Sequence, residues 1–128
     1  MRQSRNERLG RVEWFDLTVT DAEPVRAFYE KVTGWTADPL SMGDYNDYCM
    51  QAKSGDVVAG ICHARGANQG LPAQWILYIN VDNLEQSLQA CQSAGGKVLG
   101  SIREQAGSGR YCLIEDPAGA TCALYEPQ

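Results

Sequence analysis

The feature that most limits the fold of this chain is an internal repeat. Residues 16–19 (Asp-Leu-Thr-Val) align with residues 78–81 (Tyr-Ile-Asn-Val) at an offset of 62 positions (78 minus 16), and Gly34 falls on Gly96 at the same offset. In both copies an alternating strand pattern leads into a helix pattern, and three shorter strand patterns follow. Because a repeated sequence unit folds as a repeated structure, the sequence predicts an α+β protein of two βαβββ units, each with one helix on one apolar face of a mixed sheet.

The first copy contains the clearest transition from strand to helix. Phe15, Leu17 and Val19 alternate with polar residues, as in a strand with two different faces. Asp21 then occupies the N-cap position, and Gly34 stands where a helix ends. The apolar stripe between them recurs at helical spacing and consists of Val25, Phe28, Tyr29 and Val32. We therefore expect a helix over residues 22–33.

Turn residues divide the rest of the chain into further elements. Residues 35–37 are a weak strand candidate that we expect to end before Asp38-Pro39. In the second copy, Asp82 is the expected N-cap of a helix over residues 83–94, because Glu85 follows three positions later as in a capping box. The remaining strand candidates are residues 45–52, 57–63, 75–81, 97–103, 109–115 and 121–125.

These elements also indicate the domain organisation. Residues 1–10 carry several arginines without apolar periodicity, and we expect a flexible N-terminal arm. Residues 11–128 suit one domain of ordinary size, made of the repeats 11–64 and 73–127. The linker between the repeats is residues 65–72, which are rich in Gly, Ala, Asn and Gln and show no periodicity.

Charge and cysteine content limit the partners and the compartment. The formal net charge is -5 and the sequence pI about 4.7, which disfavours a nucleic-acid backbone or an anionic membrane as partner. No apolar run reaches the roughly 18 residues of a membrane helix. A neutral or cationic small molecule is the expected ligand. The 5 cysteines are odd in number and lack Cys-x-x-Cys spacing, which is typical of free thiols and favours a cytoplasmic location.

The strand alternation assigns residues to two sheet faces. Leu17 and Ile79 belong to the faces that the helices cover, so their neighbours point the other way. The opposite faces carry Trp14, Asp16 and Thr18 in the first copy and Ile76, Tyr78 and Asn80 in the second. A carboxylate in a partly apolar place needs a partner. The alternatives for Asp16 are a hydrogen bond across the sheet, a tyrosine hydroxyl, an arginine such as Arg110, or a cationic ligand; a role as acid or base is a further alternative.

Two motifs resemble the vicinal-oxygen-chelate superfamily. One is the helix segment with Asp21, Phe28-Tyr29 and Gly34-Trp35; the other is residues 109–125, where Gly-Arg-Tyr precedes Asp-Pro-x-Gly and Leu-Tyr. The resemblance extends over residues 12–126. It implies two βαβββ modules whose sheets form a cup with the helices outside. The ligand-binding residues expected in this cup are Trp14, Asp16, Thr18, Tyr78, Asn80, Thr121 and Tyr125.

Catalytic members of that superfamily hold a divalent metal through His, Gln or Glu at four strand positions. By the resemblance, these positions are Trp14, Gly60, Ile76 and Ala123 here, and none is a metal ligand. The only histidine, His63, falls off the cup face by parity. Glu13 and Glu126 neighbour two of the positions but would suit only a weak site for a hard cation. We therefore expect no metal and no other cofactor.

The superfamily contains glyoxalase I, bleomycin-resistance proteins, fosfomycin-resistance enzymes and extradiol dioxygenases, so the resemblance does not fix an activity. Our leading interpretation is a small-molecule-binding protein of the glyoxalase/bleomycin-resistance type that works without the usual metal. One alternative is a metal-dependent lyase, isomerase or dioxygenase, and another is an interaction module whose cup is filled by Trp14 and Tyr78. Relatives are commonly dimers, and we expect a two-fold homodimer, with or without exchange of modules. The sequence does not name the ligand or decide whether a reaction is catalysed.

Overall fold

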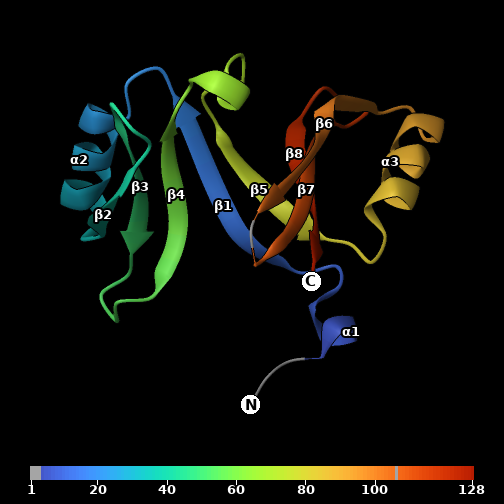
Figure 1. Cartoon of the computed structure of the whole chain (residues 1–128), viewed down its shortest axis with the longest axis horizontal. Helices are drawn as coiled ribbons and strands as arrows, with labels where there is room; N and C mark the ends of the chain where they lie inside the picture. The colour runs from blue at the N-terminus through green and yellow to red at the C-terminus, as the bar shows by residue number, and fades with distance from the viewer. Residues whose placement is uncertain (1–3, 106) are drawn as a thin grey trace. The chain divides into compact units, whose positions relative to one another are not determined.

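The computed structural model describes residues 4–105 and 107–128, except for the side chains of Ala67 and Gln105. The chain forms two compact units, which we call the first unit (residues 14–75) and the second unit (residues 4–13 and 76–128). Each unit contains a mixed four-stranded sheet and one long helix (Figure 1). The predicted α+β class with two successive βαβββ runs is therefore confirmed.

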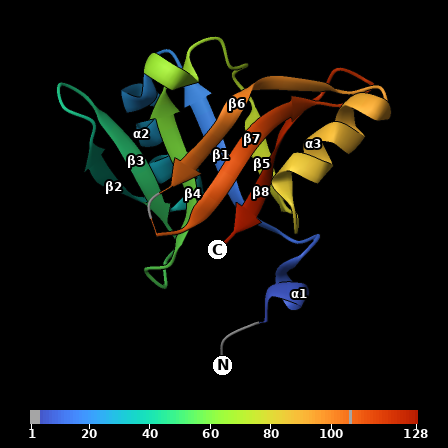
Figure 2. The ribbon, with the colours of Figure 1, turned by 45° about the vertical axis from the view of Figure 1, so that its right-hand side comes forward.

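The first unit contains β1 (Val12–Val19), α2 (Ala22–Thr33), β2 (Thr36–Ser41), β3 (Asn46–Gln51) and β4 (Val57–His63). The strand order is β2-β3-β4-β1. β1 runs parallel to β4, whereas β3 is antiparallel to both of its neighbours. The crossover helix α2 covers one face of this sheet, as Figure 2 shows from a second direction.

The second unit contains β5 (Trp75–Asn80), α3 (Leu84–Ser93), β6 (Lys97–Gln105), β7 (Gly109–Glu115) and β8 (Thr121–Pro127). Its strand order is β5-β8-β7-β6, again with one parallel pair, β5 with β8. The parallel pairs of the two units correspond, but the second strand of the pair is offset by 63 residues (123 minus 60) where the first is offset by 62. Asp16 pairs with Gly60 in the first unit, and Tyr78, its counterpart at the repeat offset, pairs with Ala123 in the second.

The observed helix boundaries can be compared with the cap residues predicted from the sequence. The helix predicted over residues 22–33 is confirmed, with the Asp21 side chain accepting from the backbone N–H of Glu23 and Gly34 in the left-handed conformation at φ +79°. In the second copy the predicted N-cap is wrong by one residue. Asn83, not Asp82, caps α3 by accepting from the backbone N–H of Gln86 at 3.0 Å. Both residue types cap well, so spacing alone did not separate them.

The strand after α2 is longer than expected. It continues through Asp38-Pro39 to Ser41, pairing with β3 throughout. The sequence predicts an end before this proline because proline has no backbone N–H to donate to a sheet. β2 is the edge strand of its sheet, where one side needs no hydrogen bonds, so Pro39 is tolerated.

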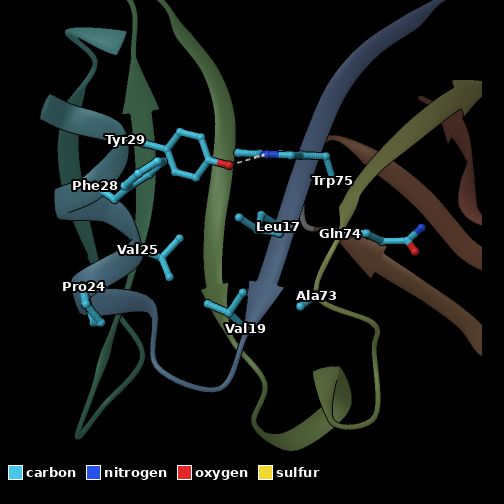
Figure 3. A pocket seen from close by; sticks show the side chains of 9 residues that line it. All are labelled: Leu17, Val19, Pro24, Val25, Phe28, Tyr29, Ala73, Gln74 and Trp75. Carbon is cyan, nitrogen blue, oxygen red and sulfur yellow. Dashed lines mark hydrogen bonds between the residues drawn. The ribbon is translucent and has the colours of Figure 1, made fainter. Parts of the chain in front are cut away.

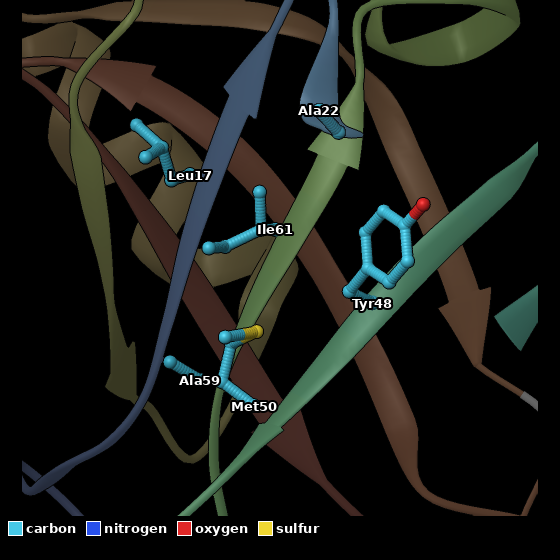
Figure 4. Close-up of a cluster of buried hydrophobic side chains, with 6 residues drawn as sticks. All are labelled: Leu17, Ala22, Tyr48, Met50, Ala59 and Ile61. Atoms are coloured by element: carbon cyan, nitrogen blue, oxygen red, sulfur yellow. The ribbon is translucent and has the colours of Figure 1, made fainter. Parts of the chain in front are cut away.

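Each helix packs on its own apolar cluster. In the first unit the buried residues are Leu17, Ala22, Tyr48, Met50, Ala59 and Ile61 (Figure 4). In the second unit they are Leu84, Cys112 and Leu124. Full burial of a side chain such as Ile61 contributes about 1.5–3 kcal/mol. These clusters define the helix-covered face of each sheet, and so identify the opposite face on which we expect the ligand.

The segment before β1 makes specific contacts within the second unit. Residues Arg5–Arg8 form the short helix α1, and Arg5 donates to the carbonyl of Asp82 at 2.7 Å and to that of Pro127. The buried Asn80 amide donates to the Arg8 carbonyl at 3.0 Å. Such contacts were not expected of a flexible arm. No helix in residues 4–105 and 107–128 is long and apolar enough to span a membrane.

Candidate functional site

The face of the first sheet opposite α2 carries a tryptophan held to an aspartate. Trp14 Nε1 donates a hydrogen bond of 2.7 Å to Asp16 Oδ1, and both side chains are half-buried. Gly60 on β4 lies beside this pair. A Cβ at position 60 would stand 2.5 Å from Asp16 Oδ1 and 3.3 Å from Trp14 Cζ2. The pair therefore requires a residue without a side chain at position 60.

Thiols and further carboxylates occupy the neighbouring positions of this face. Thr18 is buried and pairs with Cys62 on β4. Burial raises the pKa of the Cys62 thiol, and the charges of Asp16 and Asp47 raise it further. Burial likewise raises the pKa of Cys49, with added contributions from Asp38, Asp16 and Asp47. The face is thus acidic, and its thiols are protonated at neutral pH rather than poised as nucleophiles.

The equivalent face of the second unit is aromatic. Tyr78 is buried, and its ring centroid lies 5.5 Å from that of Tyr111. The Tyr125 hydroxyl is hydrogen-bonded to the Ser108 hydroxyl. Thr121 begins β8 opposite Glu115 of β7. Of the expected ligand-binding residues, Tyr78, Thr121 and Tyr125 therefore belong to this unit, and Trp14, Asp16 and Thr18 to the first.

Asn80 holds the segment around residues 8–13 through hydrogen bonds. Its side-chain amide donates to the Arg8 carbonyl and, at 2.8 Å, to Glu13 Oε1. Its backbone exchanges hydrogen bonds with Gly10 and Arg11. Both amide hydrogens of the side chain are thus used to fasten the segment before β1. The sequence pattern placed Asn80 correctly on the strand but gave no sign of this partner.

The four positions implied for a metal do not fit one. Trp14 offers only an N–H donor, Gly60 has no side chain, and the side chains of Ile76 and Ala123 are hydrocarbon. Ile76 is 2% exposed and Ala123 is 0% exposed. Within the described part of the chain, no group of three or more His, Cys, Asp or Glu side chains is arranged to hold a metal ion. A transition metal needs converging N, O or S ligands. The side chains at these four positions supply none, and they suit contact with an organic molecule instead.

The two glutamates beside those positions are engaged elsewhere. Glu13 accepts from Asn80 and from Arg8 Nε at 3.1 Å, and these contacts hold its pKa below the usual range. Glu126 Oε1 accepts from Arg110 Nη2 at 2.8 Å and from the backbone N–H of Leu84 at 2.9 Å, at the start of α3. Glu126 therefore supports the helix-covered side of its sheet.

His63 also lies away from the Trp14–Asp16 face, as its parity predicted. Its Nδ1 is 3.0 Å from the Asn46 carbonyl oxygen, and its Nε2 is 3.7 Å from Oδ1 of Asp21, the N-cap of α2. Its ring packs edge-on against Tyr45 with 5.2 Å between centroids. These neighbours account for a buried histidine without a ligand role.

A polar hollow of about 760 Å³ lies in the second unit and is lined by Ser4, Arg5, Arg8, Glu13, Gly107, Ser108 and Gln128. Its charged groups are already partnered. Arg8 pairs with Glu13, and Arg5 pairs with Asp82 at 3.1 Å. We therefore regard the Trp14–Asp16 face as the better candidate site. Sequence reasoning missed the contributions of Asp47, Cys49 and Cys62 to this face, although period-2 counting along β3 and β4 would have assigned them to it.

The fold agrees with comparisons to known proteins. The chain belongs to the glyoxalase/bleomycin resistance protein/dioxygenase superfamily, whose sequence model matches residues 11–124. "Putative glyoxylase CFP32" of Mycobacterium tuberculosis is 32% identical over 121 residues, which are 93% of this chain and 46% of that protein. "Anthracycline biosynthesis protein DnrV" of Streptomyces peucetius is 30% identical over 128 residues, covering 91% of this chain and 46% of that protein. The chain thus spans about half the length of these curated relatives.

Solved structures of lower identity share the fold. Methylmalonyl-CoA epimerase from Mycobacterium tuberculosis has a TM-score of 0.60 at 17% identity, with 94% of this chain and 90% of that chain covered. A glyoxalase/bleomycin resistance protein/dioxygenase superfamily member from Vibrio splendidus has a TM-score of 0.58 at 13% identity, with 91% and 97% covered. At such identities the similarity concerns the fold and not the activity.

Proposed function

We propose that this chain binds a small organic molecule on the Trp14–Asp16 face of the first unit without a divalent metal. The observation that carries the proposal is the side-chain set at the strand positions where metal-dependent members of the family hold their metal. By the family resemblance, Trp14 and Gly60 correspond to two of these positions in the first unit. The Trp14 indole N–H donates to Asp16, and Gly60 leaves room beside that pair. An indole face with a fixed carboxylate suits an organic ligand with an apolar body and a donor or cationic group.

The charge of this face favours the same kind of ligand. Asp16, Asp38 and Asp47 are close enough to Cys49 to raise the pKa of its thiol. An anionic ligand would meet repulsion here, whereas a positive or hydrogen-bond-donating group would be attracted to the carboxylates. The expected ligand is therefore neutral or cationic.

The proposal can be tested by thermal stabilisation. Small neutral and cationic compounds, including an anthracycline because of the name of the Streptomyces relative, would be screened for a rise in melting temperature with and without EDTA. Asp16→Ala should abolish the rise while the protein stays folded. Asp16→Asn keeps an oxygen acceptor for Trp14 Nε1 and serves as the matched control. It should retain binding of neutral ligands and weaken that of cationic ones.

A second function, glyoxalase-type catalysis, is suggested by the name "Putative glyoxylase" of the Mycobacterium relative, and the catalytic members of the superfamily imply a divalent metal for it. A standard glyoxalase assay with added Zn²⁺, Ni²⁺, Mn²⁺ or Fe²⁺ distinguishes the two. Metal-dependent turnover would replace the binding proposal, whereas a ligand-induced rise that EDTA does not affect would support it.

We further infer a homodimer and a cytoplasmic location. All 5 cysteines are free thiols in the structure, in keeping with a reducing compartment. Closed two-fold symmetry is the commonest assembly of soluble chains. Light scattering of the purified chain tests the dimer, and fractionation of cells that express the native protein tests the location.

A further inference from the structure

Two hollows away from the Trp14–Asp16 face differ in their chemistry. The first unit has an open apolar hollow of about 440 Å³ beside α2 (Figure 3). Its lining is uncharged, and its indole N–H at Trp75 already donates to the Tyr29 hydroxyl at 3.0 Å. The second unit has the polar hollow of about 760 Å³ described above, whose lining includes two arginines and a glutamate. Of these two hollows, the polar one therefore contains the charged groups that can select a ligand.

One of the two arginines fixes the segment before β1. Arg5 Nε donates to the Asp82 carboxylate at 3.1 Å, and Arg5 Nη2 donates to the Asp82 carbonyl at 2.7 Å. Its Nη1 donates to the Pro127 carbonyl. Each nitrogen of this guanidinium thus has an acceptor within the protein, so Arg5 forms part of the wall of the hollow.

The other arginine, Arg8, forms an ion pair with Glu13 that uses only part of each group. Arg8 Nε donates to Glu13 Oε1 at 3.1 Å, and the Asn80 amide donates to the same oxygen at 2.8 Å. Among the residues that the structure describes, Arg8 Nη1 and Nη2 and Glu13 Oε2 have no hydrogen-bond partner. Each of the two side chains is 35% exposed. These atoms can therefore contact a ligand while the ion pair stays intact.

Both members of this pair are charged at neutral pH. The hydrogen bonds from Asn80 and Arg8 hold the pKa of Glu13 below its usual range, and a guanidinium stays protonated in proteins. A simple anion at Arg8 would be repelled by Glu13, and a simple cation at Glu13 would be repelled by Arg8. A molecule that carries both charges side by side satisfies both groups.

The rest of the lining does not change this preference. Ser4, Gly107, Ser108 and Gln128 have neutral side chains or none. The Ser108 hydroxyl is hydrogen-bonded to the Tyr125 hydroxyl, and the Gln128 backbone N–H donates to the Ser108 carbonyl at 3.0 Å. Since Arg5 is neutralised by Asp82, the pair of Arg8 and Glu13 determines which charges the hollow accepts.

We propose that this hollow binds a small zwitterion, a free α-amino acid, with its carboxylate on Nη1 and Nη2 of Arg8 and its ammonium on Oε2 of Glu13. A guanidinium is a planar fork that matches a carboxylate. The two charged groups of an α-amino acid are attached to one carbon, which suits two protein groups held within one ion pair. A volume of about 760 Å³ leaves room for a side chain. The proposal does not depend on the ligand of the Trp14–Asp16 face, because the hollow is lined by the second unit alone.

An NMR titration of the whole chain at pH 7 tests the proposal. L-Alanine is a sufficient probe, because the two contacts use groups that all α-amino acids share. It should shift the backbone amide signals of Arg8, Glu13 and Ser108 until they saturate. L-Lactate lacks the ammonium and L-alaninamide lacks the carboxylate. Each should bind at least about tenfold more weakly than L-alanine, since each leaves one charge of the hollow unpaired.

Two variants separate the roles of the pair. Arg8→Met should weaken L-alanine binding at least about tenfold through loss of the carboxylate contact. Glu13→Gln keeps an oxygen acceptor for Arg8 and Asn80. It should weaken binding of L-alanine but strengthen that of L-lactate, because the repelling charge is gone. The matched control is Arg11→Met, since Arg11 donates to the Glu7 carbonyl at 2.8 Å and does not line the hollow. Its binding should equal that of wild type.

Circular dichroism verifies the fold of each variant, and one well-folded variant of the pair is sufficient. A wild-type chain that shows no saturable shift with L-alanine at tens of millimolar would overturn the proposal. So would equal affinity for L-alanine and L-lactate, because Glu13 would then have no part in recognition. Unchanged L-alanine binding by Arg8→Met and Glu13→Gln would also overturn it. Loss of a ligand from the Trp14–Asp16 face would affect none of these results, so the two proposals fail separately.

Discussion

Gly34 and Gly60 are both required in the first unit, but for different physical reasons. Gly34 ends α2 at φ +79°, and nothing lies within 4 Å of the place where its Cβ would be. Gly60 has an ordinary φ, but a Cβ there would stand 2.5 Å from Asp16 Oδ1. A substitution at the first position therefore strains the backbone, and one at the second displaces the candidate site.

This difference gives the first prediction. Gly60→Ala should destabilise the protein by about 1–3 kcal/mol through overpacking, and should abolish the ligand-induced rise in melting temperature because Trp14 and Asp16 must move. Gly34→Ala is the control. It should cost about 1 kcal/mol through backbone strain and leave the ligand response intact. Urea unfolding and thermal shift measure both quantities. Normal ligand binding by Gly60→Ala would show that the ligand does not use this pair.

Cys62 gives a second prediction. Burial raises the pKa of its thiol, and the nearby carboxylates of Asp16 and Asp47 add to that effect. Since the thiolate is the reactive form, iodoacetamide at pH 8 should modify Cys62 much more slowly in the folded chain than in urea. Peptide mapping by mass spectrometry gives the rate for each cysteine separately. Rapid labelling in the folded state would mean that Cys62 is an exposed, activated thiol, and a nucleophilic function would have to be considered.

For single residues of the site, the sequence predicted the sheet face to which each side chain points but not its hydrogen-bond partner. Period-2 alternation correctly separated Asp16 from Leu17, because adjacent side chains of a strand must point to opposite faces. The bond between Trp14 and Asp16 was not predicted, although the two residues are on the same face of one strand, because alternation carries no information about side-chain rotamers. The closeness of Gly60 depends on the pairing register between β1 and β4, which one sequence does not specify.

At the level of elements, an ion-pair network fixes the start of α3. Arg110 on β7 forms a two-pronged contact with Glu85 in the first turn of α3, at 2.8 and 2.7 Å, and also binds Glu126 on β8. Glu126 in turn accepts from the Leu84 backbone N–H. The Arg110 guanidinium lowers the pKa of Glu85 to about 2 and holds that of Glu126 below its usual range. The network therefore links the helix to two strands of its sheet.

The third prediction is the pH dependence of this network. A carboxyl whose pKa is lowered by folding stabilises the folded state above its unfolded pKa, about 4.5 here, and that stabilisation is lost as the pH falls toward 2. Wild type should be more stable than Arg110→Met at pH 7, and the difference should shrink below pH 4.5. Urea unfolding at a series of pH values measures it. The control is Lys97→Met, which removes a looser pair with Glu115 at 3.8 Å and should show little difference at any pH. A gap between wild type and Arg110→Met that stays constant down to pH 3 would contradict this assignment.

Elements were predictable where a local signal decides them. Asp21 and Gly34 bracket α2 because the cap chemistry lies within the helix sequence itself. The sequence did not predict features that depend on contacts between distant parts of the chain. Pro39 continues β2 only because that strand is at an edge, and α1 is docked by Asp82, Pro127 and Asn80, which are more than seventy residues away in the sequence. No local pattern carries such long-range information.

At the scale of the whole molecule, the repeat was the most informative feature. Two stretches related by 62 residues predicted two units of the same topology. Asp16 and Tyr78 keep that offset, whereas their pairing partners Gly60 and Ala123 are 63 residues apart, a difference of one residue that the repeat did not predict. The repeat also shows where the copies differ, as at Phe28 and Ala90. The identity of the ligand was not predictable, because the side chains of the face define a chemistry but not a molecule.

The last prediction concerns metal. Because Trp14, Gly60, Ile76 and Ala123 occupy the four implied positions, Zn²⁺, Ni²⁺, Mn²⁺ or Fe²⁺ should not raise the melting temperature through a site on these sheet faces. A site with a micromolar dissociation constant, at a hundredfold excess of metal, would stabilise the protein by about 2.7 kcal/mol, or several degrees for a domain of this size. Differential scanning fluorimetry resolves such a shift easily. His63→Ala is the necessary control, since it removes the only histidine and with it the commonest source of adventitious binding. A rise that EDTA abolishes and His63→Ala retains would require carboxylates or thiols of the chain to converge on a metal in solution, and metal-dependent catalysis would then become the better description of this protein.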